Sequence, residues 1–334
     1  MFPIHRANYR TLDPDFTGQV FVADIDRTYL ATRFSSLSGM ARIPFERAEE
    51  KRDIDGMARL FREIRMGPAE QTRDTPLFFV SASPYQLRPV IERKMVLDGI
   101  GFDGTTFKDW SRVVRRMRWH RLREQIGFKL TALVAHRADM PEGAEEVLIG
   151  DDLENDPLTY SLYADMLARR IPATDVERIL VMNGVLPTDA RDIARCMRDL
   201  KPGRGVLRAC IRLERFSDPD DFVSYGPSVV PCKSAFQMSV ALWRIGSIAR
   251  AGIGRVAHEL VGRGSAPERM TEQLGDLVRR ALLPPGEARE LAAELAEKNV
   301  LALPFEPGSA DPKWVKLQAR GRDRLWTPPR YVGE

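Results

Sequence analysis

The fold of this chain is decided by the stretch FVADIDRT, residues 21–28, where an apolar run is followed by two aspartates and a threonine. Residues 20–23 are apolar or small and predict a buried strand. Positions two apart on a strand share a face, so Asp24 and Asp26 can point to one place beyond the carboxyl end of the strand. In open α/β sheets this edge binds ligands. Two carboxylates at one place repel each other unless a cation or a proton lies between them. The alternative interpretation is a solvated strand end, where the two aspartates only cap the next segment.

Two later apolar runs also end in polar residues. The run at 77–80 leads into Ser81 and Ser83, and the run at 147–149 leads into the acidic stretch GDDLEND, residues 150–156. Between them, Lys129 opens an amphipathic segment. Strands that alternate with helices predict an α/β fold with a doubly wound, mostly parallel sheet. The polar residues of all these motifs are then expected at one edge of that sheet.

The periodicity of the apolar residues predicts the other elements. Strands are expected at 19–24, 77–81, 105–107, 147–149 and 178–182, and residues 1–17 are expected to be irregular. Helices are expected after Asp53, from Pro84, from Lys129 and from Pro157. After Pro187 the character shifts to helical segments, including one long helix at 235–261, so a domain boundary is predicted near 185.

Composition sets the broad class of the protein. The 334 residues suffice for one large or two ordinary domains, and 43% are hydrophobic. No run approaches the ~20 apolar residues of a membrane span, and the N-terminal residues lack the apolar core of a signal peptide. Cys196, Cys210 and Cys232 form no metal pattern and indicate free thiols in a reducing compartment. A cytoplasmic protein is therefore expected, with contact at a membrane surface as an option.

The net charge of +4 is modest, but six arginines lie within residues 112–123. A solvated helix face explains such a run more often than a binding site does. The alternative is that Arg115 and Arg116 bind an anionic substrate. No nucleic-acid motif accompanies the run, and a nucleic-acid partner is not expected.

The four motifs, taken in order, resemble the haloacid dehalogenase superfamily. The stretches at 78–87 and 149–160 more closely resemble the catalytic domain of the actin-patch phosphatidate phosphatase family. This resemblance covers about residues 18–184. It implies a haloacid dehalogenase-like phosphatase domain over 1–184, with little or no cap, followed by a mainly helical accessory region over 185–334.

The resemblance also implies a reaction, namely hydrolysis of a phosphomonoester through an aspartyl-phosphate intermediate. Asp24 would be the nucleophile, and Asp26 would be the general acid and base. Ser81 and Lys129 would hold the phosphoryl group. Ser83 would either join them or cap the helix that starts at Pro84.

The cofactor that the resemblance implies is Mg²⁺, a hard ion that prefers oxygen ligands. Its ligands would be the Asp24 carboxylate, the backbone carbonyl of Asp26, and Asp151. Asp152 or Asp156 would complete the site or hold its waters.

The chain departs from the family pattern at two positions. Arg27 stands where the family usually has an aspartate, and Asp152 stands where it usually has a small polar residue. The segments 29–76 and 84–128 leave little room for a cap, so an open site is expected. Such a site suits a phosphatidate-like lipid headgroup or another bulky phosphomonoester. The alternatives are a non-catalytic membrane- or protein-binding scaffold and a nucleic-acid end phosphatase.

Overall fold

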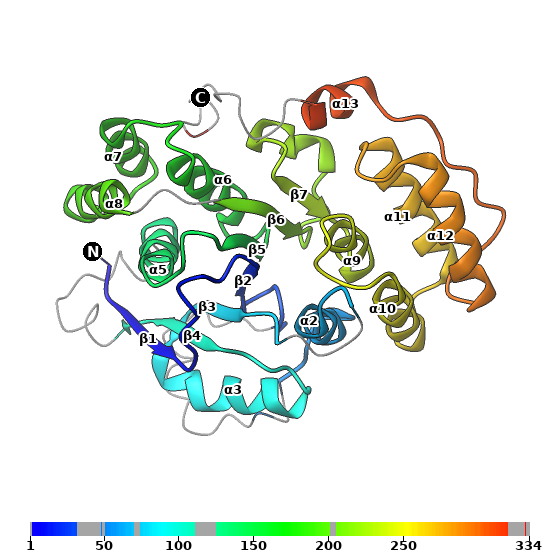
Figure 1. Ribbon diagram of the computed structural model, residues 1–334, viewed down its shortest axis with the longest axis horizontal. Coiled ribbons are helices and arrows are strands. Elements are labelled where there is room, and N and C mark those ends of the chain that lie inside the picture. Colours follow the sequence, from blue (N-terminus) through cyan, green and yellow to red (C-terminus); the bar gives the residue numbers. More distant parts are fainter. Residues whose placement is uncertain are drawn as a thin grey trace.

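The computed structural model describes residues 2–31, 48, 51–69, 74–110, 125–200, 205–319 and 331. A seven-stranded open sheet crosses the centre of the molecule in the order β1-β4-β3-β2-β5-β6-β7, with helices on both faces (Figure 1). β1 runs antiparallel to β4, and all other neighbouring strands are parallel. The predicted α/β class and mostly parallel sheet are confirmed.

The strands are β1 Ile4–Asn8, β2 Gln19–Asp24, β3 Leu77–Pro84, β4 Gly104–Lys108, β5 Glu145–Asp151, β6 Val206–Arg212 and β7 Val229–Cys232. The helices are α2 Met57–Met66, α3 Arg88–Leu97, α5 Ile126–Ala138, α6 Asp156–Leu167, α7 Ala173–Met182, α8 Pro187–Asp199, α9 Ala235–Trp243, α10 Arg250–Gly262, α11 Pro267–Arg279, α12 Pro285–Glu297 and α13 Pro312–Ala319, with short 3₁₀ segments η3 Tyr85–Leu87 and η5 Pro219–Tyr225. None of the helices among the described residues is long and apolar enough to cross a membrane.

Both faces of the sheet are covered, which explains why its central strands are continuously apolar. Along β2, Phe21 and Ala23 enter the core shared with α2, α3 and α9–α12. Val22, between them, faces the other core, shared with α5–α8. The alternation follows from the two-residue period of a strand. It leaves polar side chains room only at the strand ends.

The position of β2 in the sheet determines where a site can form. From β2 the chain moves outward through β3 and β4, and it then returns to place β5 on the other side of β2. The carboxyl ends of β2 and β5 therefore flank the point where the strand order reverses, which is where open α/β sheets bind ligands. Asp24 ends β2, and Asp151 ends β5.

Several predicted boundaries differ from the structure. The strands predicted at 19–24, 77–81, 105–107 and 147–149 are present. Pro84 is the last residue of β3, and α3 begins only at Arg88, after η3. The strand predicted at 178–182 is wrong, because these residues lie in α7, where Val176, Ile179 and Leu180 face the core at helical spacing. The single helix predicted at 235–261 is two helices, separated by a turn with Gly246 at φ 70°.

Three strands were missed. β1 lies in the segment expected to be irregular, where it pairs along the outer edge of β4. β6 and β7 come from the region after 185 that was expected to be mainly helical, and they continue the sheet beyond β5. The sheet therefore crosses the domain boundary that the sequence predicted.

Candidate active site

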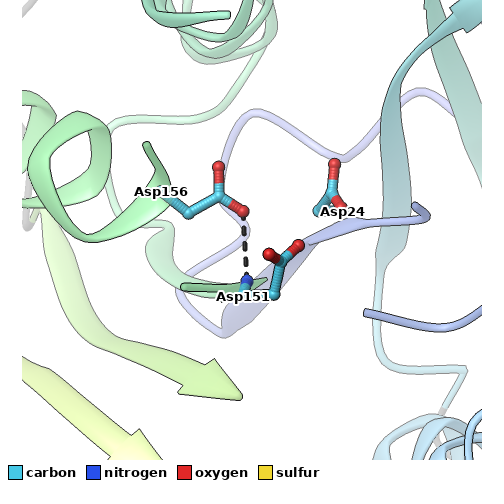
Figure 2. A group of neighbouring side chains, drawn as sticks. All are labelled: Asp24, Asp151 and Asp156. Carbon is cyan, nitrogen blue, oxygen red and sulfur yellow. Dashed lines mark hydrogen bonds between the residues drawn. The ribbon is translucent and has the colours of Figure 1, made fainter. Parts of the chain in front are cut away.

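Three aspartates converge at the switch point of the sheet. Figure 2 shows Asp24 at the end of β2, Asp151 at the end of β5 and Asp156 at the start of α6. Each offers a carboxylate oxygen, and these oxygens lie within 4.8 Å of one another. All three side chains are buried. The sequence predicted this convergence from the polar ends of separate strands.

Asp156 is held in place by the backbone of Asp151. The Asp151 N–H donates to Asp156 Oδ2 at 3.2 Å, the contact drawn in Figure 2. Asp151 Oδ1 in turn accepts from the N–H groups of Leu153 and Glu154, at 2.7 and 3.1 Å. The turn between β5 and α6 thus fixes both acids before any ligand arrives.

Lys129 is the cation of the site. Its Nζ lies 3.1 Å from Asp24 Oδ1 and 2.7 Å from Glu154 Oε2, and it also contacts Asp156. It is buried in the first turn of α5, which begins three residues earlier than predicted. Glu154 was not predicted as a site residue, although it lies within the acidic stretch that the sequence singled out.

Several buried carboxylates share this one lysine, and the pKa values of Asp24, Asp151 and Asp156 are raised. Burial raises the pKa of Asp24 well above its usual value; Lys129 opposes the rise, while Asp156, Glu154 and Asp151 add to it. Burial and then Asp156 raise the pKa of Asp151 to about 7. Burial alone would lower the pKa of Lys129, but Asp156, Asp24 and Glu154 raise it instead. A further positive charge would therefore stabilise the ionised carboxylates of the site.

The two oxygens of Asp24 point to where such a charge would bind. Both are buried, and neither accepts a hydrogen bond from a described residue. The ion pair with Lys129 contributes attraction to one oxygen without a hydrogen bond. Three converging carboxylates and unsatisfied carboxylate oxygens fit a hard divalent cation, because such ions take oxygen ligands.

Asp26 sits beside this cluster between two serines of β3. Ser81 Oγ donates to Asp26 Oδ2 at 2.6 Å, and Ser83 Oγ lies 3.0 and 2.9 Å from Oδ1 and Oδ2. The backbone N–H of Ser83 also donates to Ser81 Oγ at 3.0 Å. The helix-cap interpretation of Ser83 is wrong, since no side chain caps the turn that follows. The structure thus brings Asp26 together with Ser81 and Ser83, and it brings Asp24 together with Lys129.

Residues 19–177 match the family model of the phosphatidate phosphatase APP1 catalytic domain. This match supports an APP1-like family and implies phosphatase activity. It spans β2 to α6 and so includes every site residue named above. No curated protein and no solved structure matches the chain.

Asp152 lies within the APP1-like span, but the structure does not bring it into the aspartate cluster. Its carboxylate accepts from Glu214 N at 2.7 Å, Arg215 N at 3.1 Å and Ser217 Oγ at 2.7 Å. These groups belong to the loop 213–217 that follows β6. Neighbouring positions at a strand end point in opposite directions, so Asp151 faces the cluster while Asp152 faces this loop. Of the two acids predicted to complete the metal site, Asp156 is the one in the cluster.

The turn after β2 carries the two remaining residues of the motif. Thr28 Oγ1 lies 3.4 Å from Asp151 Oδ2 and so joins the turn to the end of β5. Arg27 has a left-handed backbone at φ 64°, and its guanidinium lies 3.5 Å from Glu214 Oε1. Arg115 and Arg116, predicted to bind the substrate, lie outside the described residues, and that role stays a prediction.

Proposed function

We propose that this protein is a Mg²⁺-dependent phosphatase that hydrolyses a phosphatidate-like phosphomonoester through an aspartyl-phosphate on Asp24. The main observation behind the proposal is the environment of the Asp24 carboxylate. It is buried and has no hydrogen bond from a described residue, and it lies beside Lys129 and two further acids. A structural aspartate would normally have its oxygens satisfied, whereas a nucleophile must present one to its substrate.

In the first step, an oxygen of Asp24 attacks phosphorus and the bond to the leaving oxygen breaks. Lys129 orients the carboxylate and offsets the negative charge of the incoming phosphoryl group. Its raised pKa keeps the ammonium charged at neutral pH, because three acids surround it. In the second step, water attacks the same phosphorus, the bond to Asp24 breaks, and inorganic phosphate leaves.

Asp26 moves the proton in both steps. Its carboxyl group first gives a proton to the leaving alkoxide and then, as a carboxylate, takes one from the attacking water. Ser81 and Ser83 contact both of its oxygens and so fix its orientation. When the phosphoryl group binds, either serine hydroxyl is placed to donate to it instead.

Mg²⁺ would be held by the carboxylates of Asp24, Asp151 and Asp156, with the Asp26 carbonyl as a further ligand. The ion, when bound, supplies the positive charge that lets an anionic carboxylate approach an anionic phosphate. Burial first, and then the neighbouring acids, raise the pKa values of Asp24, Asp151 and Asp156, and a bound cation would offset both effects.

A lipid substrate requires contact with a membrane surface, and Phe216 supports this part of the proposal. Its side chain is 90% exposed, and its backbone is left-handed at φ 57°, which is rare for a bulky residue. The loop that carries it is bound to Asp152, next to Asp151 in the cluster. An aromatic side chain held in solvent, on a loop bound at the carboxyl end of β5, suits the interface of a bilayer.

The test is phosphate release from three substrates, with Mg²⁺ or with EDTA: phosphatidate in detergent micelles, p-nitrophenyl phosphate, and a 5′-phosphorylated oligonucleotide. We expect Mg²⁺-dependent release from the first two. Release from the oligonucleotide alone would indicate a nucleic-acid end phosphatase, and release from none would indicate a binding scaffold. Activity that survives EDTA would refute the metal assignment.

A further inference from the structure

Arg212 is the last residue of β6 and lies beyond the span that matches the APP1 family model. Its Nε and Nη2 both donate to the backbone carbonyl of Arg27, at 2.9 and 2.6 Å. Its own main chain pairs with Asp151, and its carbonyl accepts from Asp152 N at 3.1 Å. One residue therefore contacts the ends of both strands that carry the aspartate cluster.

The contact with Arg27 fixes a strained turn. The N–H of Arg27 donates to Leu30 O at 2.9 Å, so both polar groups of its backbone are bonded. Its left-handed conformation is disfavoured for a residue with a side chain and persists only where the surroundings hold it. A guanidinium presents its donors in a rigid fork, and two of them on one oxygen fix the direction of that carbonyl.

Glu214 holds the guanidinium in turn. It forms an ion pair with Arg212 and lies near the side chain of Arg27, while its backbone N–H is bound by Asp152. Arg212 is 9% exposed, while the side chains of Arg27 and Glu214 are only partly buried. The guanidinium of Arg212 is thus shielded from water, and its bonds to the Arg27 carbonyl and to Glu214 together define its orientation.

We infer that Arg212 is a positioning residue for the proposed phosphatase reaction, on which this inference rests. By holding the Arg27 carbonyl, it fixes the turn between Asp26 and Thr28. That turn determines where the Asp26 carboxyl meets the leaving oxygen and where Thr28 meets Asp151. A strand outside the matched span thus completes the geometry of the acid–base step.

The kinetic test compares Arg212→Met and Arg212→Lys with a matched control, Arg208→Met. Arg208 lies four residues earlier on the same face of β6, about 13 Å from Arg212 at 3.3 Å per residue. We expect Arg212→Met to lower kcat by about 30-fold or more for an alkyl phosphate, but by only a few-fold for p-nitrophenyl phosphate, whose leaving group needs little protonation. Arg212→Lys keeps the charge without the fork and should lie in between. An equal loss for both leaving groups, or a loss matched by Arg208→Met, would overturn the inference.

A second measurement does not depend on activity. Amide hydrogen exchange over residues 25–31, in metal-free protein, reports whether the turn is held. We expect exchange at least about tenfold faster in Arg212→Met, and unchanged in Arg208→Met; should the methionine variant fail to fold, Arg212→Lys is measured instead. Unchanged exchange in the Arg212 variants would refute the inference. An inactive wild-type protein would refute the proposed function, while the exchange result would still decide whether Arg212 holds the turn.

Discussion

The ammonium group of Lys129 lies 3.1 Å from a carboxylate oxygen of Asp24, and both groups are buried. This ion pair belongs to a set in which Asp156 and Glu154 compete for the same lysine. Removing Asp24 and removing Lys129 should therefore have opposite effects on the stability of the metal-free protein, although each substitution should abolish catalysis.

Asp24→Asn should reduce phosphate release to below about a tenth of the wild-type rate, because an amide cannot attack phosphorus. In EDTA its melting temperature should be equal to or above that of the wild type. The reason is that the raised pKa of Asp24 makes its ionised form a cost to the folded state at neutral pH. Retained turnover would remove Asp24 as the nucleophile.

Lys129→Met should also abolish turnover, but it should destabilise the protein. The substitution leaves Asp24, Asp156 and Glu154 without their shared cation, and breaking a buried ion pair from one side costs about 3–5 kcal/mol. Denaturant unfolding in EDTA measures the loss. A stability equal to wild type would mean that the buried acids are neutral without the lysine.

Asp151 and Asp152 are adjacent acids that offer a matched comparison. Asp151→Asn should weaken Mg²⁺ binding, so that activity is partly recovered at high Mg²⁺ and the stabilisation by Mg²⁺ shrinks. Asp152→Asn should leave Mg²⁺ affinity unchanged, since its carboxylate binds the loop 213–217. It should instead lower the free energy of unfolding by about 1 kcal/mol, because the N–H groups of Glu214 and Arg215 then bond a neutral amide oxygen in place of a charged one.

Titration of both variants with Mg²⁺, followed by calorimetry and by thermal melting, separates the two roles. If the two substitutions weaken Mg²⁺ binding equally, the assignment of Asp156 rather than Asp152 to the metal site is wrong. If neither does so, the aspartate cluster does not bind the ion.

The contrast between Asp151 and Asp152 shows which features of the site could be predicted from the sequence. Asp24, Asp151 and Asp156 were predictable because each follows or ends an apolar run, and the ends of parallel strands meet. The two-residue period of a strand predicts that Asp152 points away from the cluster. It does not predict which groups the Asp152 carboxylate binds. Two of them are backbone N–H groups, which no side-chain pattern records, and the third is the Ser217 hydroxyl; all lie in a loop more than 60 positions later.

Arg212 was beyond prediction for a related reason. The stretch VLRACIR, residues 206–212, lies in a region whose helical segments dominate the pattern, so β6 was missed. The partner of Arg212 is a backbone carbonyl 185 positions away. A carbonyl is present in every residue, so the sequence cannot indicate which one an arginine binds. Only the order of the strands reveals that the end of β6 lies near the turn after β2.

Membrane contact through Phe216 can be measured without turnover. Phe216→Ala should bind vesicles of phosphatidylcholine and phosphatidylglycerol about tenfold more weakly in EDTA, as expected for the loss of one inserted aromatic side chain. Val96→Ala is the control. Val96 is also exposed, but it lies near the end of α3, which runs back to the opposite edge of the sheet. Equal binding by both variants would remove Phe216 as the contact.

The last prediction concerns Asp220, in η5, which lies between β6 and β7 and contacts residues of α11 and α13. Its carboxylate accepts from Arg279 Nη1 at 3.1 Å and Trp314 Nε1 at 2.7 Å, and it also binds Lys313. Burial opposes ionisation, but the hydrogen bonds from Lys313, Trp314 and Arg279 outweigh it and lower the pKa of Asp220 to about 2. A carboxyl whose pKa is lowered by folding stabilises the folded state above its unfolded pKa.

The stabilisation by Asp220 should therefore be complete at neutral pH and should disappear as the pH falls from about 4 to about 2. Asp220→Asn should melt at a lower temperature than wild type at pH 7, with a gap that closes over this range. The exposed acid Glu290 provides the control, because its ion pair with Arg250 at 3.5 Å is open to solvent and Glu290→Gln should change little at any pH. A gap for Asp220→Asn that stays constant down to pH 2 would show that the carboxylate charge contributes nothing and that only the shape of the side chain matters.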